Sequence, residues 1–357
     1  MAEKRKILHI VEAMGGGVFT YLVELANGLC NEFEVTIAFG IRSETPENYA
    51  DYFDDTIKLI KVENFERSLN PVKDIKACLE LRKIVKSSSP DIIHMHSSKA
   101  GAIGRITINS KKHRMFYTPH GYSFLMEDVS NFKKNIYKKI EEICGKKNCM
   151  TIACGKSEWE ESKKVTKKST YISNGINTER LDQVLTLDQG VYPKNKFTVY
   201  TVGRISYQKN PELFNKTAQL VPDVQFIWIG DGDMKECLTS PNIKVTGWTE
   251  SEDALRLAKQ GDVFILPSRW EGLPISLLEA MYMKKPCIVS NVVGNKDVIS
   301  DYVTGYICNT AEEFAEVIRK LEKEIDIRVT EGAHKEVMEK YNSNGLCDRY
   351  REVYLGK

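Results

Sequence analysis

The chain lacks the features that mark membrane-spanning, disulfide-stapled and nucleic-acid-binding proteins. Its apolar runs all fall short of the roughly 18 residues that a membrane-spanning helix requires. Its nine cysteines are scattered and form no Cys-x-x-Cys pair, which is typical of buried free thiols in a reducing cytoplasm. An excess of one charge is also absent, because 51 Lys and Arg face 49 Asp and Glu and leave a net charge of +2. We therefore expect a cytoplasmic protein that binds no nucleic acid.

The N-terminal segment "MAEKRKILHIVEAM" imitates a signal peptide without being a good one. Lys4, Arg5 and Lys6 precede apolar residues, but His9 and Glu12 interrupt the run after a few positions. A secretory h-region is longer and uninterrupted. The segment predicts a first β-strand instead.

Short apolar runs alternate with helical patterns along the whole chain. One series runs from "KILHIVEA" through "DIIHMH" and "RMFYTP" to "TYIS", and after a polar connection at 182–194 a second series runs from "FTVYTVG" to "GYIC". Buried parallel strands that alternate with helices predict an α/β protein of two doubly wound, Rossmann-like domains. Such sheets bind ligands at the carboxyl ends of their strands, and two facing domains favour a ligand in the cleft between them.

Two loops of the first series carry candidate site residues. Gly15, Gly16 and Gly17 separate the first strand from an amphipathic helix, where glycine allows close backbone approach and the helix start offers N–H groups to an anion. The pattern is neither a dinucleotide-binding nor a Walker A loop, so a plain tight turn is an equal alternative. His120 follows a strand in "YTPHGYSF", where an imidazole can donate a hydrogen bond or shuttle a proton, although a lone histidine is more often structural.

A third loop, "TVGRISYQKNP", follows the first strand of the second series. It places Arg204 and Lys209 after a glycine. Arginine can bind phosphate oxygens bidentately and lysine adds a point charge, so the pair suits a diphosphate. A solvated loop with two ordinary basic residues is the alternative.

The fourth loop leads into "EGLPISLLEAMYMKKP" and carries two glutamates eight positions apart. Glu271 precedes a helix that we expect to begin at Pro274 and to continue to Lys284–Lys285. Glu279 lies inside that helix among Leu, Ala and Met, and a buried carboxylate without a partner is costly. Carboxylates at these two levels can accept hydrogen bonds from two linked sugar rings, and we expect the N–H groups of Gly272 and Leu273 to bind a phosphate between them.

Two residue pairs imitate metal sites. His94 and His96 in "DIIHMHS" point the same way from a strand, but the sequence offers no evident third ligand. Asp231 and Asp233 in "IGDGD" spell a metal-binding motif of another class of sugar transferases. They follow a strand directly without a supporting carboxylate cluster, which is typical of a strand-to-helix turn. We expect no metal and no other cofactor.

Together and in this order, the four loops resemble glycosyltransferase family 4, retaining enzymes of the GT-B fold, and in particular those of bacterial surface and capsular polysaccharide synthesis. The resemblance covers nearly the whole chain. Its most specific motif is Glu-x7-Glu in "EGLPISLLE", supported by "LPS", "GRISYQKNP", "SNGIN" and "IGDG". Family members often carry Glu in the loop after "VVGNK", where this chain has Asp297, so no role is assigned to that residue.

The resemblance implies a role for each matched residue. Glu271 would contact hydroxyl groups of the donor sugar, and Glu279 the ribose hydroxyls. Arg204 and Lys209 would neutralise the leaving diphosphate in place of a metal, and His120 would lie beside the transferred sugar. The other implied donor-binding residues are Gly16, Gly17, Asn174, Gly203, Gly230, Trp248, Gly272 and Leu273.

The resemblance also implies the domain organisation and the reaction. An acceptor-binding domain at 1–180, onto which a last helix at 343–357 packs back, would precede a nucleotide-sugar-binding domain at 181–342. The enzyme would move a sugar from a nucleotide-diphosphate donor, uridine-linked by preference, to a saccharide acceptor. Charge builds on the departing diphosphate, so fixed cations there stabilise the transition state most.

Residues 131–168 add an expectation about the acceptor. The stretch 131–170 holds 11 Lys against 5 Glu, and the pattern predicts an amphipathic helix that carries Lys134 and Lys138 together with Phe132 and Ile136. Lysine beside apolar groups suits an anionic membrane surface, although a solvated helix face with Lys–Glu pairs would look similar. We expect peripheral binding at the inner face of the plasma membrane and favour a lipid-linked saccharide acceptor.

Other functions stay open at this point. A sugar-nucleotide epimerase or a phosphorylase of the same fold would share the donor loops. A non-catalytic carbohydrate- or nucleotide-sugar-binding protein would share them too, although intact Glu271, Glu279, Arg204, Lys209 and His120 argue against a lost activity.

Overall fold

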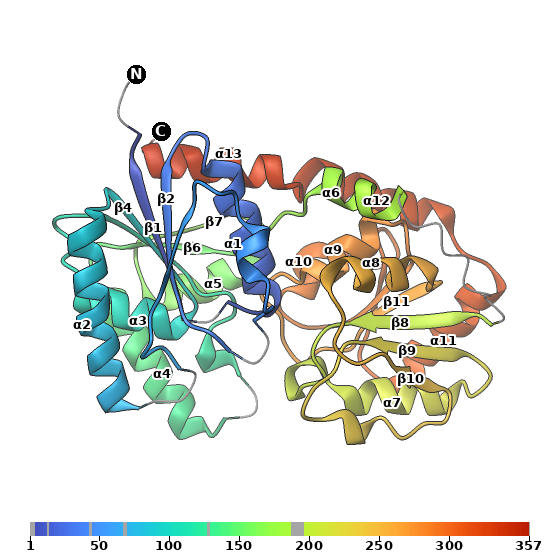
Figure 1. Cartoon of the computed structure of the whole chain (residues 1–357). Helices are drawn as coiled ribbons and strands as arrows, with labels where there is room; N and C mark the ends of the chain where they lie inside the picture. Colours follow the sequence, from blue (N-terminus) through green and yellow to red (C-terminus); the bar gives the residue numbers. More distant parts are fainter. Residues whose placement is uncertain are drawn as a thin grey trace. The chain divides into compact units, whose positions relative to one another are not determined.

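A computed structural model describes residues 4–12, 14–42, 45–66, 70–126, 129–186 and 196–356. The chain forms two compact units. The first comprises Met1–Asn174 together with Ser343–Lys357, and the second comprises Gly175–Asn342. The division thus falls between Asn174 and Gly175, where sequence reasoning places it at residue 180. Each unit is a parallel sheet with helices on it (Figure 1).

The first unit contains a seven-stranded sheet in the order β3-β2-β1-β4-β5-β6-β7. All of its pairings are parallel, β4 is buried from end to end and β1 is buried after Lys6, as expected for strands covered on both faces. The strands are β1 (Lys6–Val11), β2 (Glu34–Phe39), β3 (Lys58–Lys61), β4 (Ile92–His96), β5 (Arg114–Thr118), β6 (Met150–Ala153) and β7 (Ser169–Tyr171). The helices are α1 (Gly16–Leu29), α2 (Pro71–Ser88), α3 (Ser98–Thr107), α4 (Asn131–Cys144), α5 (Lys156–Val165) and α13 (Ser343–Leu355), with the 3-10 turns η1 (Tyr49–Tyr52) and η2 (Ser123–Leu125).

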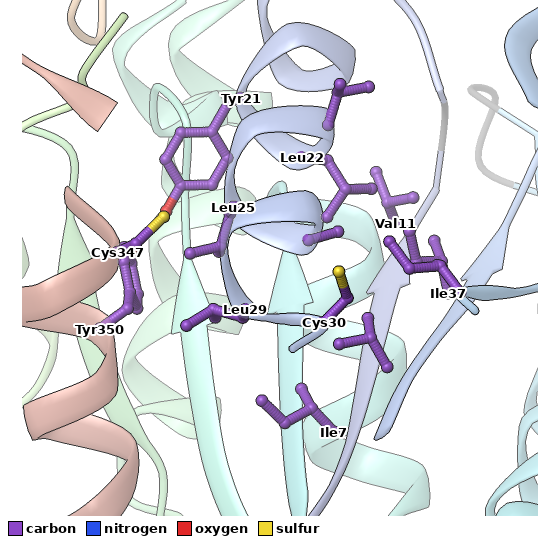
Figure 2. Packing of buried hydrophobic residues seen from close by; sticks show 14 of the residues in the cluster. Ile7, Val11, Tyr21, Leu22, Leu25, Leu29, Cys30, Ile37, Cys347 and Tyr350 are labelled. Carbon is purple, nitrogen blue, oxygen red and sulfur yellow. The ribbon is translucent and has the colours of Figure 1, made fainter. Parts of the chain in front are cut away.

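Helix α13 is distant in sequence but packs on α1 within the first unit. Leu22 of α1 points toward Val11 and Ile37 of the sheet, and Tyr350 of α13 belongs to the same buried cluster (Figure 2). The two helices approach so closely that a Cβ on Gly28 would lie 2.3 Å from the sulfur of Cys347. The other face of the sheet packs against α2, α3 and α4 in a separate cluster (Figure 1).

The second unit contains a six-stranded parallel sheet in the order β10-β9-β8-β11-β12-β13. Its strands are β8 (Thr198–Val202), β9 (Gln225–Ile229), β10 (Ile243–Val245), β11 (Val263–Leu266), β12 (Cys287–Ser290) and β13 (Tyr306–Cys308). Its helices are α6 (Thr178–Thr186), α7 (Pro211–Leu220), α8 (Ser251–Gln260), α9 (Ile275–Tyr282), α10 (Asn295–Val298), α11 (Ala311–Lys323) and α12 (Ile327–Lys340), with η3 (Tyr207–Lys209) and η4 (Lys235–Cys237).

Both sheets reverse their strand order once. The reversal lies between β1 and β4 in the first unit and between β8 and β11 in the second. At such a point the two flanking loops leave the sheet in opposite directions and open a crevice at the carboxyl ends of the strands. The loops after β8 and β11 are the ones that carry Lys209 and Glu271.

Two local predictions need correction. Helix α9 begins at Ile275, with Pro274 as its N-cap residue, and ends at Tyr282 rather than at Lys284–Lys285. The chain leaves the helix there because Lys284 adopts a left-handed conformation with φ of 56°. After β9 the "IGDGD" turn leads into the 3-10 turn η4 and then β10, not into an α-helix.

The described residues contain no helix with both the length and the apolar character needed to cross a bilayer.

Candidate active site

The loops after β8 and β11 meet through the carboxylate of Glu271. Its Oε1 accepts hydrogen bonds from Lys209 Nζ at 2.7 Å and from Ser268 Oγ at 2.7 Å. Its Oε2 accepts a longer hydrogen bond of 3.3 Å from the side-chain amide of Gln208. The Glu271 side chain is only 7% exposed and that of Lys209 18%. A buried acid is thus paired with a half-buried cation at the point where the sheet reverses its strand order.

Arg269 locks the two loops together around this pair. Its guanidinium stacks on the ring of Tyr207 at 3.9 Å from the centroid, and it forms an ion pair with Glu212 at 3.2 Å. Its backbone N–H donates to the carbonyl of Gln208 at 2.8 Å. These contacts fix the backbone on both sides of the Lys209–Glu271 pair, so the charged groups are held before any ligand arrives.

Asn210 holds the loop after β8 in place for the start of α7. It adopts a left-handed conformation with φ of 56°, and its side-chain oxygen accepts the N–H of Leu213 at 3.3 Å. Its side-chain nitrogen donates to the carbonyl of Pro267 at 3.1 Å. One asparagine therefore caps a helix and ties the β8 loop to the β11 loop.

Gly203 and Gly230 end β8 and β9 with backbones that side chains rarely adopt. Their φ angles are 138° and 137°, and a Cβ on Gly230 would lie 2.3 Å from the carbonyl oxygen of Gly203. The indole of Trp228 donates to the same carbonyl at 2.8 Å. Both glycines have a clear packing reason, and their predicted contact with a donor stays a prediction. Arg204 follows Gly203 and is half-buried.

Glu279 is half-buried, so the expectation that it is buried was wrong. Its helix α9 covers the sheet with Leu277, Leu278, Ala280 and Met281, while position 279 lies at the edge of that covered face. Burial first, and then the nearby Cys287 and Glu279, raise the pKa of the Tyr200 phenol well above its ordinary value. The carboxylate of Glu279 therefore lies close to β8.

The remaining predicted residues of the second unit occupy the same edge of its sheet. The loop after β12 packs on the backbone at 271–272, where Glu271 N–H donates to Val293 at 3.1 Å and a Cβ on Gly294 would lie 2.5 Å from the carbonyl oxygen of Gly272. Leu273 is buried, and Trp248 is 60% exposed on the loop after β10.

In the first unit, Gly16 and Gly17 are exposed at the start of α1. Gly16 has φ of 56°, and a Cβ on either glycine would meet nothing within 4 Å. The N-cap residue Gly15 makes no side-chain cap, so the first N–H groups of α1 are not capped by it. Asn174 is buried at the end of this unit.

Four of the five histidines of the first unit form one cluster, in which His9, His94 and His96 are buried and His120 is half-buried. His9, on β1, lies opposite His94 on β4 in the sheet register. Its Nδ1 is 3.0 Å from Nε2 of His96, whose Nδ1 is 3.1 Å from Nε2 of His120. The Nδ1 of His120 is 3.3 Å from the sulfur of Cys154.

The expectation that His94 and His96 have no third neighbour was wrong, because His9 lies beside them. One nitrogen from each of these three rings falls within 4.8 Å of the others. Both nitrogens of His94 are already in contact with hydroxyl groups, those of Thr118 at 2.8 Å and of Tyr354. Both nitrogens of His96 contact other imidazoles, so an ion would have to replace existing hydrogen bonds.

Burial keeps these imidazoles neutral. Burial lowers the pKa of His9 and of His120 to about 3. Burial first, and then the neighbouring histidines, lower the pKa of His94 and of His96 well below the ordinary value. The ring of His120 is therefore uncharged and has both nitrogens engaged within its own unit.

Sequence reasoning missed the residues that support the predicted ones. The roles of Gln208 and Arg269 come from the meeting of two loops more than 50 positions apart. Ser268 lies three positions before Glu271 in the same loop, and its contact with that carboxylate depends on how the loop folds. His9 was taken only as an interruption of an apolar run. The sequence places His9 in a predicted strand, but only the strand order shows that this strand lies beside the one that contains His94 and His96.

Comparison with known proteins agrees with this geometry. Residues 186–336 match the family model "Glycosyl transferases group 1", and residues 15–180 match "Glycosyltransferase Family 4". A relative from Escherichia coli, UDP-Gal:alpha-D-GlcNAc-diphosphoundecaprenol alpha-1,3-galactosyltransferase, is 29% identical over 339 residues, which are 85% of each chain. A 41.2 kDa protein in the cps region of Klebsiella pneumoniae is 26% identical over 98% of this chain and 99% of its own.

The fold has a close counterpart among solved structures. Anabaena HepE in complex with UDP-glucose matches with a TM-score of 0.79 at 16% identity, over 99% of this chain and 100% of that one. Two doubly wound parallel sheets and this likeness show the GT-B fold. The two family models show that the chain is a glycosyltransferase. Within that class, the chain belongs to glycosyltransferase family 4. The predictions of family, fold and transferase activity are confirmed.

Proposed function

We propose that this glycosyltransferase moves a sugar from a uridine-diphosphate donor to a lipid-linked saccharide during assembly of a bacterial surface polysaccharide. The names of the Escherichia coli and Klebsiella pneumoniae relatives support the acceptor and the process. The UDP-glucose in the HepE structure supports the donor. Retention of anomeric configuration is carried over from the family resemblance and is part of the proposal.

The Lys209–Glu271 pair is the observation on which the donor site rests. Oε1 of Glu271 has two donors, whereas Oε2 has one long hydrogen bond from Gln208, so that oxygen keeps acceptor capacity for a sugar hydroxyl. Lys209 is held 2.7 Å from the acid that would bind the sugar. A cation fixed beside the sugar site is well placed to receive the negative charge that develops on the departing diphosphate.

The other donor contacts follow from the positions of the predicted residues. Arg204 would add a second cation to the diphosphate, and Glu279 would accept hydrogen bonds from the ribose. The exposed indole of Trp248 offers a flat apolar face for the base. With two cations for the diphosphate, we propose that the reaction needs no metal ion.

In the first unit, Gly16, Gly17 and the His120 turn keep the roles that the family resemblance implies, toward the diphosphate and the transferred sugar. Both glycines have open space beside them, and no side chain of the N-cap residue Gly15 caps the first N–H groups of α1. Both features support a contact between this helix start and an anion. The ring of His120 is committed to its neighbours. Its contribution is therefore proposed to come from a fixed turn rather than from proton transfer.

The first unit also offers a surface for a lipid-linked acceptor. Large exposed apolar side chains gather on the adjacent helices α2, α3 and α4, among them Ile75 at 63%, Ile106 at 64% and Phe132 at 75%. Lys133 and Lys138 of α4 are exposed as well. Apolar groups that enter the interface and lysines that meet anionic headgroups support peripheral membrane binding.

Alanine substitutions of the two cations test the donor assignment. We expect Lys209→Ala and Arg204→Ala each to lower kcat by about 100-fold, since each removes a fixed charge from the leaving diphosphate. The measurement is UDP release from UDP-sugar with acceptor present, and thermal unfolding checks that each variant is folded. Lys216→Ala, an exposed lysine on α7, is the matched control. Rates near that of the unmodified enzyme in both variants would remove the diphosphate assignment.

A further inference from the structure

The turn at His120–Gly121 is tied to its unit by one buried carboxylate. Glu158 lies in the first turn of α5 and is 1% exposed. Its Oε1 accepts the N–H of Gly121 at 2.6 Å, and its Oε2 accepts the N–H of Cys154 at 2.7 Å. It thereby joins the loop after β5 to the loop after β6.

The turn itself has a backbone that needs such support. His120 has φ of 52° and Gly121 has φ of 92°, and left-handed backbone at a residue with a side chain persists only where the surroundings hold it. A Cβ on Gly121 would meet nothing within 4 Å, so the turn has open space where a side chain at this position would begin. Firm anchorage and open space together are features of a turn that presents itself to a ligand.

Glu158 also determines where the proton of the Cys154 thiol lies. Burial first, and then the charge of Glu158, raise the pKa of this thiol well above its ordinary value, so the thiol is protonated at neutral pH. The carboxylate of Glu158 lies next to it, because its Oε2 accepts the backbone N–H of the same cysteine at 2.7 Å. A protonated thiol beside an ionised carboxylate donates to it. The sulfur lone pairs are then what faces Nδ1 of His120 at 3.3 Å, so this nitrogen carries a hydrogen and donates it.

The remaining hydrogens follow because a neutral imidazole has one N–H and one acceptor nitrogen. With Nδ1 of His120 protonated, its Nε2 accepts from Nδ1 of His96 at 3.1 Å. Nε2 of His96 in turn accepts from Nδ1 of His9 at 3.0 Å. The chain ends at Nε2 of His9, which is buried and has no hydrogen-bond partner among the described residues. If each Nδ1 donates, Nε2 of His9 keeps only an unpaired lone pair. If the hydrogen bonds ran the other way, this nitrogen would carry a buried N–H without an acceptor, which is the costlier arrangement.

We propose that Glu158, Cys154 and His96 are positioning residues that hold the His120–Gly121 turn in one geometry and fix the imidazole of His120 as its neutral Nδ1–H tautomer. The effect on catalysis rests on the proposed function, in which this turn serves the transferred sugar. The tautomer does not rest on it. Cys154 and Glu158 act through the turn and are not expected to contact donor or acceptor.

Nitrogen NMR of protein with 15N-labelled histidine tests the tautomer. The chain has six histidines, so the signals of His120 can be assigned from the spectrum of His120→Gln. We expect a protonated Nδ1 and an unprotonated Nε2 for His120 at pH 7. In Cys154→Ala the acceptor is lost, and a mixture of tautomers should appear. Cys154→Ser keeps both the donor and the acceptor and should restore the original signal.

Cys149→Ala is the control, because it removes another buried thiol of the same unit, whose sulfur contacts the carbonyl of Met150. Its His120 signals should match those of the unmodified protein. A protonated Nε2 on His120 in the unmodified protein would overturn the proposed direction of the chain. An unchanged tautomer in Cys154→Ala would overturn the role of Cys154 in fixing it.

Kinetics test the positioning role separately. Cys154→Ala and Glu158→Gln should lower kcat by about 10-fold or more while the donor KM stays within about twofold, because a displaced turn costs rate rather than donor binding. Cys154→Ser should recover most of kcat, and it keeps the test valid if Glu158→Gln does not fold. An unchanged kcat in Cys154→Ala with an altered tautomer would overturn the positioning role and leave the donor site untouched. If Lys209→Ala lost activity while Cys154→Ala and Glu158→Gln kept it, the donor site would stand and the positioning role would be overturned.

Discussion

At the scale of single residues, the second unit contains a charged pair and the first unit contains a cluster of neutral histidines. In the second unit, Glu271 is nearly buried and lies 2.7 Å from Lys209. In the first unit, His9, His94, His96 and His120 occupy a region where burial keeps every ring uncharged. The first arrangement suits the stabilisation of a developing charge, and the second suits a fixed geometry.

The neutral histidines make stability depend on pH. His9 and His120 have a pKa of about 3 in the folded chain, against roughly 6.5 in an unfolded one. Below about pH 6.5 the unfolded state binds more protons, so stability is complete above that pH and falls as pH drops toward 3. Each such histidine contributes up to about 1.4 kcal/mol per pH unit in this window.

Urea unfolding at pH 7, 6 and 5, followed by circular dichroism, measures this slope. We expect the free energy of unfolding to fall with pH and His9→Phe to reduce the fall, since it removes one of the groups that must charge on unfolding. A free energy of unfolding that is equal at pH 7 and pH 5 would contradict neutral, buried imidazoles.

Which single residues could be predicted depended on whether their partners were local in sequence. Glu271 and Lys209 were predicted because each belongs to a loop motif that can be recognised by itself. The role of His9 could not be predicted, because it follows from the parallel register that sets His9 opposite His94. The partial exposure of Glu279 was missed because its apolar neighbours in the sequence belong to the covered face of α9.

At the scale of elements, the strands were the most predictable part and the ends of helices the least. Buried parallel strands are short apolar runs, and both sheets consist of them. The end of α9 at Tyr282 was missed because two lysines and a proline resemble a normal helix ending, whereas Lys284 already turns left-handed. A turn of this kind depends on backbone geometry that residue types alone do not determine.

Helix α4 is the element whose surface carries a separate prediction. Phe132 and Ile136 are 75% and 41% exposed on a helix that also carries Lys133, Lys134, Lys138 and Lys139. We expect the protein to sediment with vesicles that contain anionic lipid at low salt, and Lys134→Glu with Lys138→Glu to weaken that binding by more than about tenfold.

The control for this experiment changes the same amount of charge elsewhere. Lys216→Glu with Lys244→Glu places it on two exposed positions of the second unit and should leave vesicle binding largely intact. Equal weakening by both pairs of substitutions, or no binding by the unmodified protein, would mean that α4 is an ordinary solvated helix.

At the scale of the whole molecule, two units of similar topology carry different functional groups at the carboxyl edges of their sheets. The carboxyl edge of the second sheet brings together loops after β8, β9, β11 and β12 through contacts that include a charged pair. The corresponding edge of the first sheet carries exposed glycines and a turn held by Glu158. The division of labour predicted from sequence, donor on the second unit and acceptor on the first, agrees with this difference and stays a prediction.

The donor site on the second unit can be tested most directly by the electron density of crystals soaked with UDP-glucose in the presence of EDTA. We expect the diphosphate within hydrogen-bonding distance of Lys209 and Arg204, a sugar hydroxyl at Glu271 and the ribose at Glu279, with no metal ion between them. Donor density bound elsewhere on the chain, or a donor that binds only when a metal ion is supplied, would contradict the proposed site.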